Sequence, residues 1–416
     1  MKKNPILQVH VKRNRDHTLG AQFYLDPAVM DLEKQDLFHA TWQFVCHVSD
    51  IRDTGDFFTF TLHGEEYFLV LNGEETLCGY ANVCPHRGHR LVDGTGNKRV
   101  ITCPYHAWTF DLNGALRGAR GLSRREKGFD QIGLSSIAVD VLAGLVFVNT
   151  SNTAPPLREF APGLEGQIFN ACPNILDYVP NRDGAEFGHT YICDANWKVM
   201  IDNYLECYHC QMAHPDFNEM MAIPDSAFTL FPTFTYQNAP TKRRSDNLAF
   251  PLDLDHDVLV GEFWWLFPNI TLGRFPGTQN FYISRFDPVT PSRTSRYTLS
   301  LKPADDTDPG ALERDRMRSV WTRDVVAKED QALCQSVQCG MSHRSFHQGW
   351  YVSDLNDHGI SEHAMRHFHD LYETWIAETT ERTGFSYPAV GCNAALWKIW
   401  AHSGHSLHLA RSSAND

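Results

Sequence analysis

Two groups of side chains in this 416-residue chain have the types and the spacing of metal ligands. The first group takes one cysteine and one histidine from each of "CPHRGH" and "CPYH", namely Cys84, His86, Cys103 and His106. The second lies in "DNYLECYHCQMAHPDF", residues 202–217, which holds two histidines, two cysteines and several carboxylates. Because such side chains are rarely buried without a partner, both groups predict a bound metal.

The first group fits two kinds of metal site. Two thiolates and two imidazoles can bind one tetrahedral zinc ion. They can also bind a 2Fe–2S cluster, in which two cysteines hold one iron and two histidines hold the other. Each loop supplies one cysteine and one histidine, so each loop can give one ligand to each of the two irons. The C-x-H spacing is also tighter than usual zinc spacings, and the proline after each cysteine stiffens its loop.

The spacing therefore favours the cluster over zinc, and in these motifs the sequence resembles the Rieske ferredoxin domain. The resemblance implies a Rieske 2Fe–2S cluster on Cys84, His86, Cys103 and His106. We expect His89 to be a polar neighbour of the cluster rather than a ligand.

The pattern of the surrounding elements changes along the chain. Residues 42–150 show short β runs separated by glycine turns, which predicts an antiparallel β-domain. Before it, residues 26–42 predict a short helix with its N-cap at the first position. After it, residues 262–300 read as strands, whereas 310–340 and 361–382 read as helices. The predicted fold class is α+β.

Composition excludes several classes of function. The chain has 37 basic and 50 acidic side chains, a formal net charge of −13, and no dense Lys/Arg block. We therefore expect no nucleic-acid partner and no binding to an anionic membrane. No apolar run reaches about 18 residues, so no membrane span is expected, and the N-terminus lacks the apolar region of a signal peptide. The odd count of 11 cysteines, without regular spacing, predicts a reducing, cytoplasmic location.

The second group of candidate ligands begins on a predicted amphipathic helix. Its apolar positions are Trp197, Met200, Ile201, Tyr204, Leu205 and Tyr208. Glu206 and His209 are three residues apart and therefore neighbours on one face. His214, five residues further, points about 140° away on an ideal helix. A shared metal would therefore need a helix break or a π-bulge between the histidines. The alternative is two histidines near a helix end that are satisfied by hydrogen bonds.

A Rieske-type domain followed by "DNYLECYHCQMAHP" resembles the α subunits of Rieske non-haem iron oxygenases, over about residues 25–390. The resemblance implies a mononuclear Fe(II) bound by His209, His214 and a distant aspartate, with positions left open for O₂ and substrate. It also implies a helix-grip-like catalytic domain with a large antiparallel sheet and flanking helices.

The resemblance also divides the chain into three parts. Residues 1–41 form an N-terminal segment that packs on the catalytic domain, residues 42–150 form the Rieske domain, and residues 151–416 form the mononuclear iron catalytic domain.

The family places its third iron ligand on a helix near the C-terminus. In residues 321–341 the candidates are Asp324, Glu329 and Asp330. Asp330 falls on an apolar stripe formed by Val326, Leu333 and Val337. Because a carboxylate on a buried stripe needs a cation to offset its desolvation, we predict Asp330 as the ligand. Glu329 is the alternative, either solvated or next to the ligands.

Glu206 has a separate predicted role in electron transfer. The resemblance implies a head-to-tail homotrimer in which the cluster of one subunit lies near the mononuclear iron of its neighbour. The carboxylate before the first histidine would then bridge His209 and a cluster histidine, His86 or His106. Ring-hydroxylating relatives usually have aspartate here. This chain has Glu206, and its motif "ECYHC" resembles that of the branch acting on quaternary ammonium compounds. That branch includes carnitine oxygenase, glycine betaine monooxygenase and proline betaine demethylase.

The other polar residues of this stretch have lesser predicted roles. Asp202, one turn before Glu206, is a predicted hydrogen-bonding partner near the site. Cys207 and Cys210 are predicted to pack as small apolar side chains.

A quaternary ammonium head favours a cage of aromatic faces. The segment "GEFWWLFPNITLGRF" offers Trp264, Trp265 and Phe267, and the iron helix offers Tyr204. Since neighbouring strand residues point to opposite faces, at most one of the two tryptophans is expected to line the pocket. The alternative for each aromatic is core packing.

The implied reaction is O₂-dependent hydroxylation next to the nitrogen of a small cationic substrate, with N-demethylation or C–N cleavage. The chain lacks a G-x-G-x-x-G motif after a strand and a second cysteine cluster, so a separate flavin and 2Fe–2S reductase must supply electrons. Two alternatives remain: an aromatic ring-hydroxylating oxygenase with an apolar pocket, and a Rieske electron carrier without oxygenase activity. The carrier would need no second iron.

Overall fold

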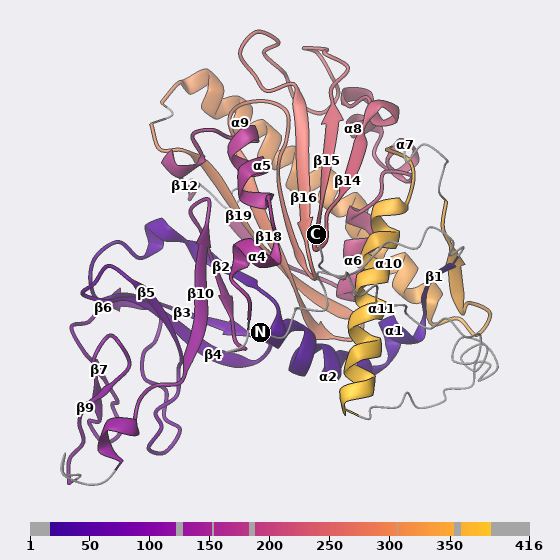
Figure 1. Cartoon of the computed structure of the whole chain (residues 1–416). Coiled ribbons are helices and arrows are strands. Elements are labelled where there is room, and N and C mark those ends of the chain that lie inside the picture. The colour runs from indigo at the N-terminus through magenta and orange to yellow at the C-terminus, as the bar shows by residue number, and fades with distance from the viewer. Residues whose placement is uncertain are drawn as a thin grey trace, which may run out of the picture. The chain divides into compact units, whose positions relative to one another are not determined.

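The structure is a computed structural model that describes residues 17–121, 128–151, 154–182, 188–305, 307–352 and 359–383. The described residues up to Trp375 form one compact unit, and those from Ile376 onward belong to a second. Antiparallel sheets and helices both contribute to the first unit (Figure 1), which confirms the predicted α+β class.

The first part of the chain forms a seven-stranded antiparallel sheet and a small three-stranded sheet. The seven strands, in sheet order, are β2 (Gln43–His47), β11 (Leu145–Asn149), β10 (Ser136–Leu142), β5 (Leu77–Ala81), β4 (Glu65–Leu71), β3 (Asp56–Leu62) and β6 (Thr95–Asn97). The small sheet contains β7 (Ile101–Thr102), β8 (Thr109–Phe110) and β9 (Leu116–Gly118). The strands of the small sheet lie between β6 and β10 in the sequence.

Two hairpins of the larger sheet close on two-residue turns with left-handed backbone. His63 (φ 51°) and Gly64 (φ 94°) join β3 to β4, and Ala143 (φ 51°) and Gly144 (φ 81°) join β10 to β11. Positive φ at both central residues matches the twist of paired antiparallel strands. One of the predicted glycine turns, the "HG" of residues 63–64, is therefore a tight hairpin turn that fixes the register of β3 against β4.

The later part of the chain forms an eight-stranded antiparallel sheet. Its main path runs through β12 (Tyr178–Pro180), β19 (Arg293–Pro303), β18 (Phe281–Thr290), β17 (Ile270–Arg274), β16 (Val260–Leu266), β15 (Phe234–Pro240) and β14 (Ala227–Leu230), and β13 (Gly188–Cys193) also pairs with β19. The strands predicted within residues 262–300 are confirmed as parts of β16 to β19.

Short helices precede and connect the sheets, and longer ones follow them. They are α1 (Gln22–Leu25), α2 (Pro27–Leu32), α3 (Phe38–Ala40), α4 (Leu157–Phe160), α5 (Leu164–Ala171), α6 (Trp197–Tyr204), α7 (Cys210–Ala213), α8 (Pro215–Met220), α9 (Pro309–Trp321), α10 (Ala327–Met341) and α11 (His363–Thr383). Strand β1 (His17–Gly20) pairs with β20 (Gln348–Trp350). The predicted N-cap is confirmed, because the Asp26 side chain accepts a hydrogen bond from Ala28 N at 2.9 Å.

The N-terminal segment is tied to α6 by a fully buried ion pair. Both Glu33 and Lys198 are fully buried, and the Lys198 ammonium bonds to the Glu33 carboxylate. The same carboxylate also accepts hydrogen bonds from Trp197 Nε1, at 2.8 Å, and from the Tyr372 hydroxyl. A buried charge is tolerated only when it is paired and hydrogen-bonded in this way. This contact therefore holds the start of α6 against the segment that precedes the first sheet.

Replacing Glu33 by alanine should lower the free energy of unfolding by about 3–5 kcal/mol, because the buried Lys198 ammonium would lose its counter-charge. Chemical denaturation followed by circular dichroism measures the change. Asp31→Ala removes an exposed carboxylate two residues away and should be nearly silent. Equal stability of the two variants would contradict the structural role of the pair.

Among the described residues, no helix combines the length and the apolar character that crossing a membrane requires.

Candidate metal centres and substrate pocket

The predicted long iron helix is interrupted. Helix α6 ends at Tyr204, earlier than the helical pattern predicts, and α7 begins only at Cys210. His209 immediately precedes α7, and His214 separates α7 from α8 with non-helical backbone (φ −124°, ψ 74°). The four residues between the histidines are helical, so the break lies at His214 itself rather than between the two histidines, and a further break precedes His209. These breaks turn both imidazoles toward one point.

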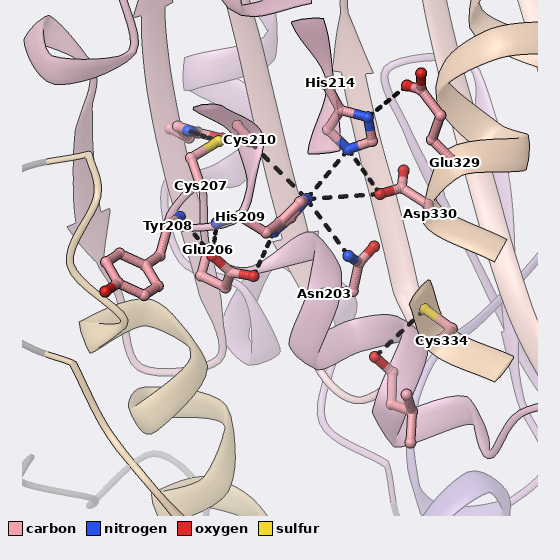
Figure 2. Close-up of polar contacts among 12 residues, drawn as sticks. Asn203, Glu206, Cys207, Tyr208, His209, Cys210, His214, Glu329, Asp330 and Cys334 are labelled. Atoms are coloured by element: carbon pink, nitrogen blue, oxygen red, sulfur yellow. Dashed lines mark hydrogen bonds and ion pairs between the residues drawn. The ribbon is translucent and has the colours of Figure 1, made fainter. Parts of the chain in front are cut away.

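The two imidazoles meet a carboxylate from α10 (Figure 2). His214 Nε2 lies 2.9 Å from Asp330 Oδ1 and 3.2 Å from His209 Nε2. His209 Nε2 lies 3.5 Å from the same oxygen. These three ligand atoms lie within 4.8 Å of one another. Two imidazoles and one carboxylate on one side of a metal are the donor set of non-haem Fe(II) centres, so the side chains fit the implied iron.

Each of the two histidines also has a carboxylate partner of its own, which contacts Nδ1, the ring nitrogen that faces away from Asp330. Glu206 bonds to His209 Nδ1 and also accepts a hydrogen bond from His209 N at 3.1 Å. Glu329 Oε2 lies 2.7 Å from His214 Nδ1. An outer carboxylate of this kind fixes the tautomer and the orientation of a ligand histidine. Both contacts leave Nε2 as the nitrogen that faces the metal.

The charges of the site show why a cation belongs there. Burial lowers the pKa of His209, but Asp330 and Glu206 outweigh it and raise that pKa to about 10. Burial acts in the same way on His214, yet Asp330 and Glu329 raise its pKa above the usual value. Burial raises the pKa of Asp330, and its hydrogen bonds to the two histidines bring the pKa well below the usual range. The Asp330 carboxylate therefore stays ionised and favours a positive partner.

The apolar stripe that predicts Asp330 is not the buried face of α10. Val337 is 46% exposed, and the buried residues of α10 are Cys334 and Gln338. Asp330 precedes Cys334 by one turn and so shares the buried face, although the stripe itself was wrong. Glu329, the alternative ligand, contacts His214 from the outer side instead.

The two cysteine loops of the first sheet region have the same backbone pattern. Cys84 N donates to His89 O at 2.8 Å, and Gly88 N donates to Cys84 O at 2.9 Å. In the second loop Cys103 N donates to the carbonyl five residues on at 2.8 Å, and the amide four residues on donates to Cys103 O at 3.0 Å. Gly88 (φ 74°) and its counterpart Ala107 (φ 57°) have left-handed backbone. The two loops are therefore built alike, as a shared cluster requires.

The four predicted cluster ligands are brought together by these loops. Cys84 and Cys103 are buried, and their thiols lie close enough to hydrogen-bond to each other. The rings of His86 and His106 have centroids 4.6 Å apart. His106 Nδ1 is buried without a hydrogen-bond partner among the described residues, as expected of an atom that awaits a metal. His89 instead bonds through Nδ1 to Arg90 O at 2.6 Å.

A pocket of about 120 Å³ opens beside the three iron-ligand candidates. Seven aromatic residues line it: Tyr191, Tyr204, Phe217, Phe263, Phe275, Tyr282 and Phe286. Polar and charged side chains in the lining include Asn203, Glu206, Gln237 and Arg296. Asn203 Nδ2 lies 3.4 Å from His209 Nε2. Of the four aromatics predicted for a substrate cage, the pocket includes Tyr204 alone.

The other three predicted aromatics are fully buried elsewhere. Trp264 donates from Nε1 to Gln167 on α5 at 2.9 Å, so its indole lies on the opposite face of β16 from its neighbour Phe263. Trp265 packs against Phe368 of α11 at a centroid distance of 5.3 Å, and Phe267 packs on Trp265. For these three residues, the alternative of core packing describes the structure.

The remaining residues of the second group have structural contacts. Asp202 accepts from the Tyr24 hydroxyl at 2.6 Å and lies 2.8 Å from His369 Nε2, so it joins α6 to α1 and α11. Cys207 and Cys210 are buried within an apolar cluster. Cys210 Sγ lies 4.0 Å from His209 Nε2, and both sulfurs border the pocket.

Comparison with known proteins gives matches over both parts of the chain. The model of the Rieske [2Fe-2S] domain matches residues 41–136, and that of the ring hydroxylating alpha subunit catalytic domain matches residues 182–378. The carnitine monooxygenase oxygenase subunit of Escherichia coli (strain K12) is 34% identical over 357 residues, 85% of this chain and 92% of that protein. The chain belongs to the Rieske non-haem iron oxygenases.

Other relatives of this Rieske oxygenase bear related names. The glycine betaine monooxygenase oxygenase subunit of Chromohalobacter salexigens is 26% identical, over 82% of this chain and 83% of that protein. A solved quaternary ammonium Rieske monooxygenase, described for carnitine oxidation and inter-subunit electron transfer, is 29% identical with a TM-score of 0.75, and the match covers 86% of this chain and 95% of that one. The predicted family and its two iron cofactors are thereby confirmed.

Proposed function

We propose that this Rieske oxygenase hydroxylates a carbon next to the nitrogen of a quaternary ammonium compound related to carnitine or betaine. The observation that carries the proposal is an iron-ligand triad that opens directly into an aromatic-lined pocket. Aromatic faces attract a desolvated ammonium head, which carries no hydrogen-bond donors. The names of the relatives, carnitine monooxygenase and glycine betaine monooxygenase, support this substrate class.

The pocket argues against the two alternatives. An electron carrier needs no second metal, yet His209, His214 and Asp330 converge beside a cavity. A ring-hydroxylating oxygenase favours an apolar pocket, whereas this lining includes Arg296, Gln237 and Asn203.

We propose His209, His214 and Asp330 as the ligands of the mononuclear iron, and Cys84, His86, Cys103 and His106 as those of the cluster. When bound, the iron supplies O₂ activation, so that R–H, O₂, two electrons and two protons yield R–OH and water. The hydroxyl on the carbon next to nitrogen makes a carbinolamine, which collapses to an aldehyde and an amine by C–N cleavage. The protein's own contribution is to fix the ligand nitrogens and to hold the cationic head beside them.

Glu206 is the proposed point of electron entry. Its side chain is 11% exposed and bonds to His209 Nδ1, so one carboxylate can reach both a ligand histidine and the protein surface. We propose a head-to-tail trimer in which this carboxylate contacts a cluster histidine of the neighbouring subunit. Exposed His86 and the 52% exposed Tyr208 next to Glu206 fit such a contact. The inter-subunit transfer described for the solved relative supports it.

A separate flavin and 2Fe–2S reductase would deliver the electrons singly to the cluster. We also propose a cytoplasmic location, because the ten cysteines of the described residues are all free, as a reducing compartment requires.

A substrate panel tests the proposed function. The oxygenase, with both metal centres loaded and a Rieske reductase supplied, is incubated with carnitine, γ-butyrobetaine, glycine betaine and choline, and with naphthalene and benzoate. Release of aldehyde or amine from at least one ammonium compound is the expected result. Oxidation of the aromatic compounds alone would replace the proposal with ring hydroxylation.

The aromatic lining gives a further prediction. Phe263→Leu should raise KM for the ammonium substrate by about 2- to 30-fold, the range of one cation–π contact, with little change in kcat. Phe281→Leu is the matched control, because Phe281 is also a buried aromatic but faces Trp264, at 6.2 Å, rather than the pocket. Steady-state kinetics of both variants checks this, and an equal KM in the two would remove Phe263 from the binding site.

A further inference from the structure

Arg296 brings a positive charge into the same pocket that is proposed to hold a cation. It projects from β19, which pairs with β13 and β18. Its Cα partners on those strands are Tyr191 and Phe286, which also line the pocket. Arg296 therefore lines the same cavity as α10, which contributes Asp330 and Gln331.

All of the direct contacts of the Arg296 guanidinium are with neutral groups. Nη1 donates to the Tyr191 hydroxyl at 3.1 Å, and Nη2 and Nε donate to Ser284 Oγ at 3.1 and 3.3 Å. Its Cζ lies 5.1 Å from the centroid of Phe286 and 5.7 Å from that of Tyr191. Among the described residues, no carboxylate lies within ion-pairing distance of this arginine.

Other arginines of the same sheet are paired. Arg274 pairs with Glu262, and Arg285 with Asp287. Arg293, three residues before Arg296 on the same strand, lies 3.3 Å from Asp194. A largely enclosed guanidinium with aromatic and hydroxyl neighbours but no carboxylate in direct contact is unusual, because buried charges are normally paired. Arg296 is thus pre-positioned, with donors to spare in its five N–H groups.

Asp330 and Glu206 also line this pocket, but these carboxylates bond to His214 and His209 rather than to the guanidinium. Two positive charges close together in one small pocket repel each other unless a negative charge lies between them. A substrate with an ammonium head alone, such as choline, would add a second cation beside Arg296. A substrate that also carries a carboxylate supplies the missing anion, and the fork of a guanidinium matches a carboxylate with two parallel hydrogen bonds. The charge arrangement therefore selects for a zwitterion and against a simple cation.

We infer that the substrate is a zwitterion with a quaternary ammonium head and a carboxylate, and that Arg296 binds this carboxylate. The aromatic residues on the other strands, Phe263, Phe275 and Tyr282, hold the ammonium head. The inference rests on the proposed function and narrows it, because carboxylate-bearing betaines become substrates while choline becomes a poor one. Arg296 then determines specificity through the end of the substrate that does not react.

The test compares γ-butyrobetaine with its carboxamide, which keeps the ammonium head and replaces the carboxylate by an uncharged amide. Both are assayed with the wild type, Arg296→Gln and Arg293→Gln. Arg293 is the matched control, since it lies on the same strand but 52% exposed. Loss of a charged bidentate contact should lower kcat/KM for γ-butyrobetaine by roughly 10- to 150-fold in Arg296→Gln. The amide should be a poor substrate of the wild type, and the variant should use it at least as well. Arg293→Gln should match the wild type on both compounds.

The outcomes separate this inference from the proposed function. If the wild type uses γ-butyrobetaine, its amide and choline equally well, and Arg296→Gln leaves their ratio unchanged, the zwitterion inference is overturned while ammonium oxidation stands. If no ammonium compound is oxidised, both fail together. Should Arg296→Gln fold poorly, Arg296→Lys keeps the charge without the fork. It should retain the preference for the carboxylate with a higher KM, and loss of that preference in a folded Lys variant would contradict the inference.

Discussion

Replacing Asp330 by alanine should reduce the iron content from about three atoms per chain to two and abolish substrate oxidation. One 2Fe–2S cluster and one mononuclear iron account for the three. Asp330 Oδ1 lies 2.9 Å from His214 Nε2 and 3.5 Å from His209 Nε2, so it is the carboxylate on which both imidazoles converge. Without it, two neutral imidazoles retain divalent iron poorly. Iron quantitation, with the visible absorption of the cluster, measures both centres in one sample.

Asp324→Ala is the control for this experiment. Asp324 lies one and a half turns earlier in the same helical region and pairs with Arg323 and Lys328 near the surface. That variant should keep three irons and full activity, and the cluster absorption should be normal in both variants. Retention of the third iron by Asp330→Ala would show that another carboxylate, such as Glu329, is the ligand.

Removal of the Glu206 carboxylate should block electron delivery while both metal centres stay in place. Glu206 and Glu329 hold equivalent positions, since each bonds to the Nδ1 of one candidate ligand histidine. A carboxylate that only orients its histidine should cost roughly 10- to 100-fold in iron affinity or activity when it is removed. Glu329→Ala should show this effect. Glu206→Ala should go further and lose coupled turnover, because it also removes the proposed path from the neighbouring subunit's cluster.

Single-turnover spectroscopy separates the two roles. In the reduced protein mixed with O₂ and substrate, the cluster should reoxidise quickly in the wild type and in iron-loaded Glu329→Ala. In Glu206→Ala the cluster should remain reduced although iron quantitation finds three atoms. Rapid reoxidation in Glu206→Ala, coupled to product, would exclude the bridge and leave Glu206 as an orienting residue.

The metal ligands could be predicted from sequence because short motifs carry them. Cys84 and His86, like Cys103 and His106, sit on single tight loops, so a few residues determine their geometry. The break before His209 was harder to predict, because no glycine or proline marks it. It arises where the Glu206 side chain accepts hydrogen bonds from the backbone amides of Tyr208 and His209, which competes with helix formation.

The substrate pocket could not be predicted in the same way. In β16 both faces are buried, since Phe263 and Trp265 point one way and Trp264 the other, and all are nearly inaccessible. Alternation of polar and apolar residues then carries no information about which face meets the iron. The pocket aromatics and Arg296 come from separate strands, and only the register of those strands brings them together.

The pairing of β2 with β11 brings the two ends of the first β-region together. The chain enters this region at β2 and leaves it at β11, and Gln43 lies directly opposite Val148 across the two strands. Opposed residues in antiparallel strands are only about 5 Å apart, so a short turn could reconnect the chain on either side. The segment before β2 supplies Glu33, which neutralises the buried Lys198 on α6. Chain on both sides of this region thus contributes to the packing of α6, and a fragment that starts at residue 42 would keep the β2–β11 pair but leave the buried Lys198 without its counter-charge.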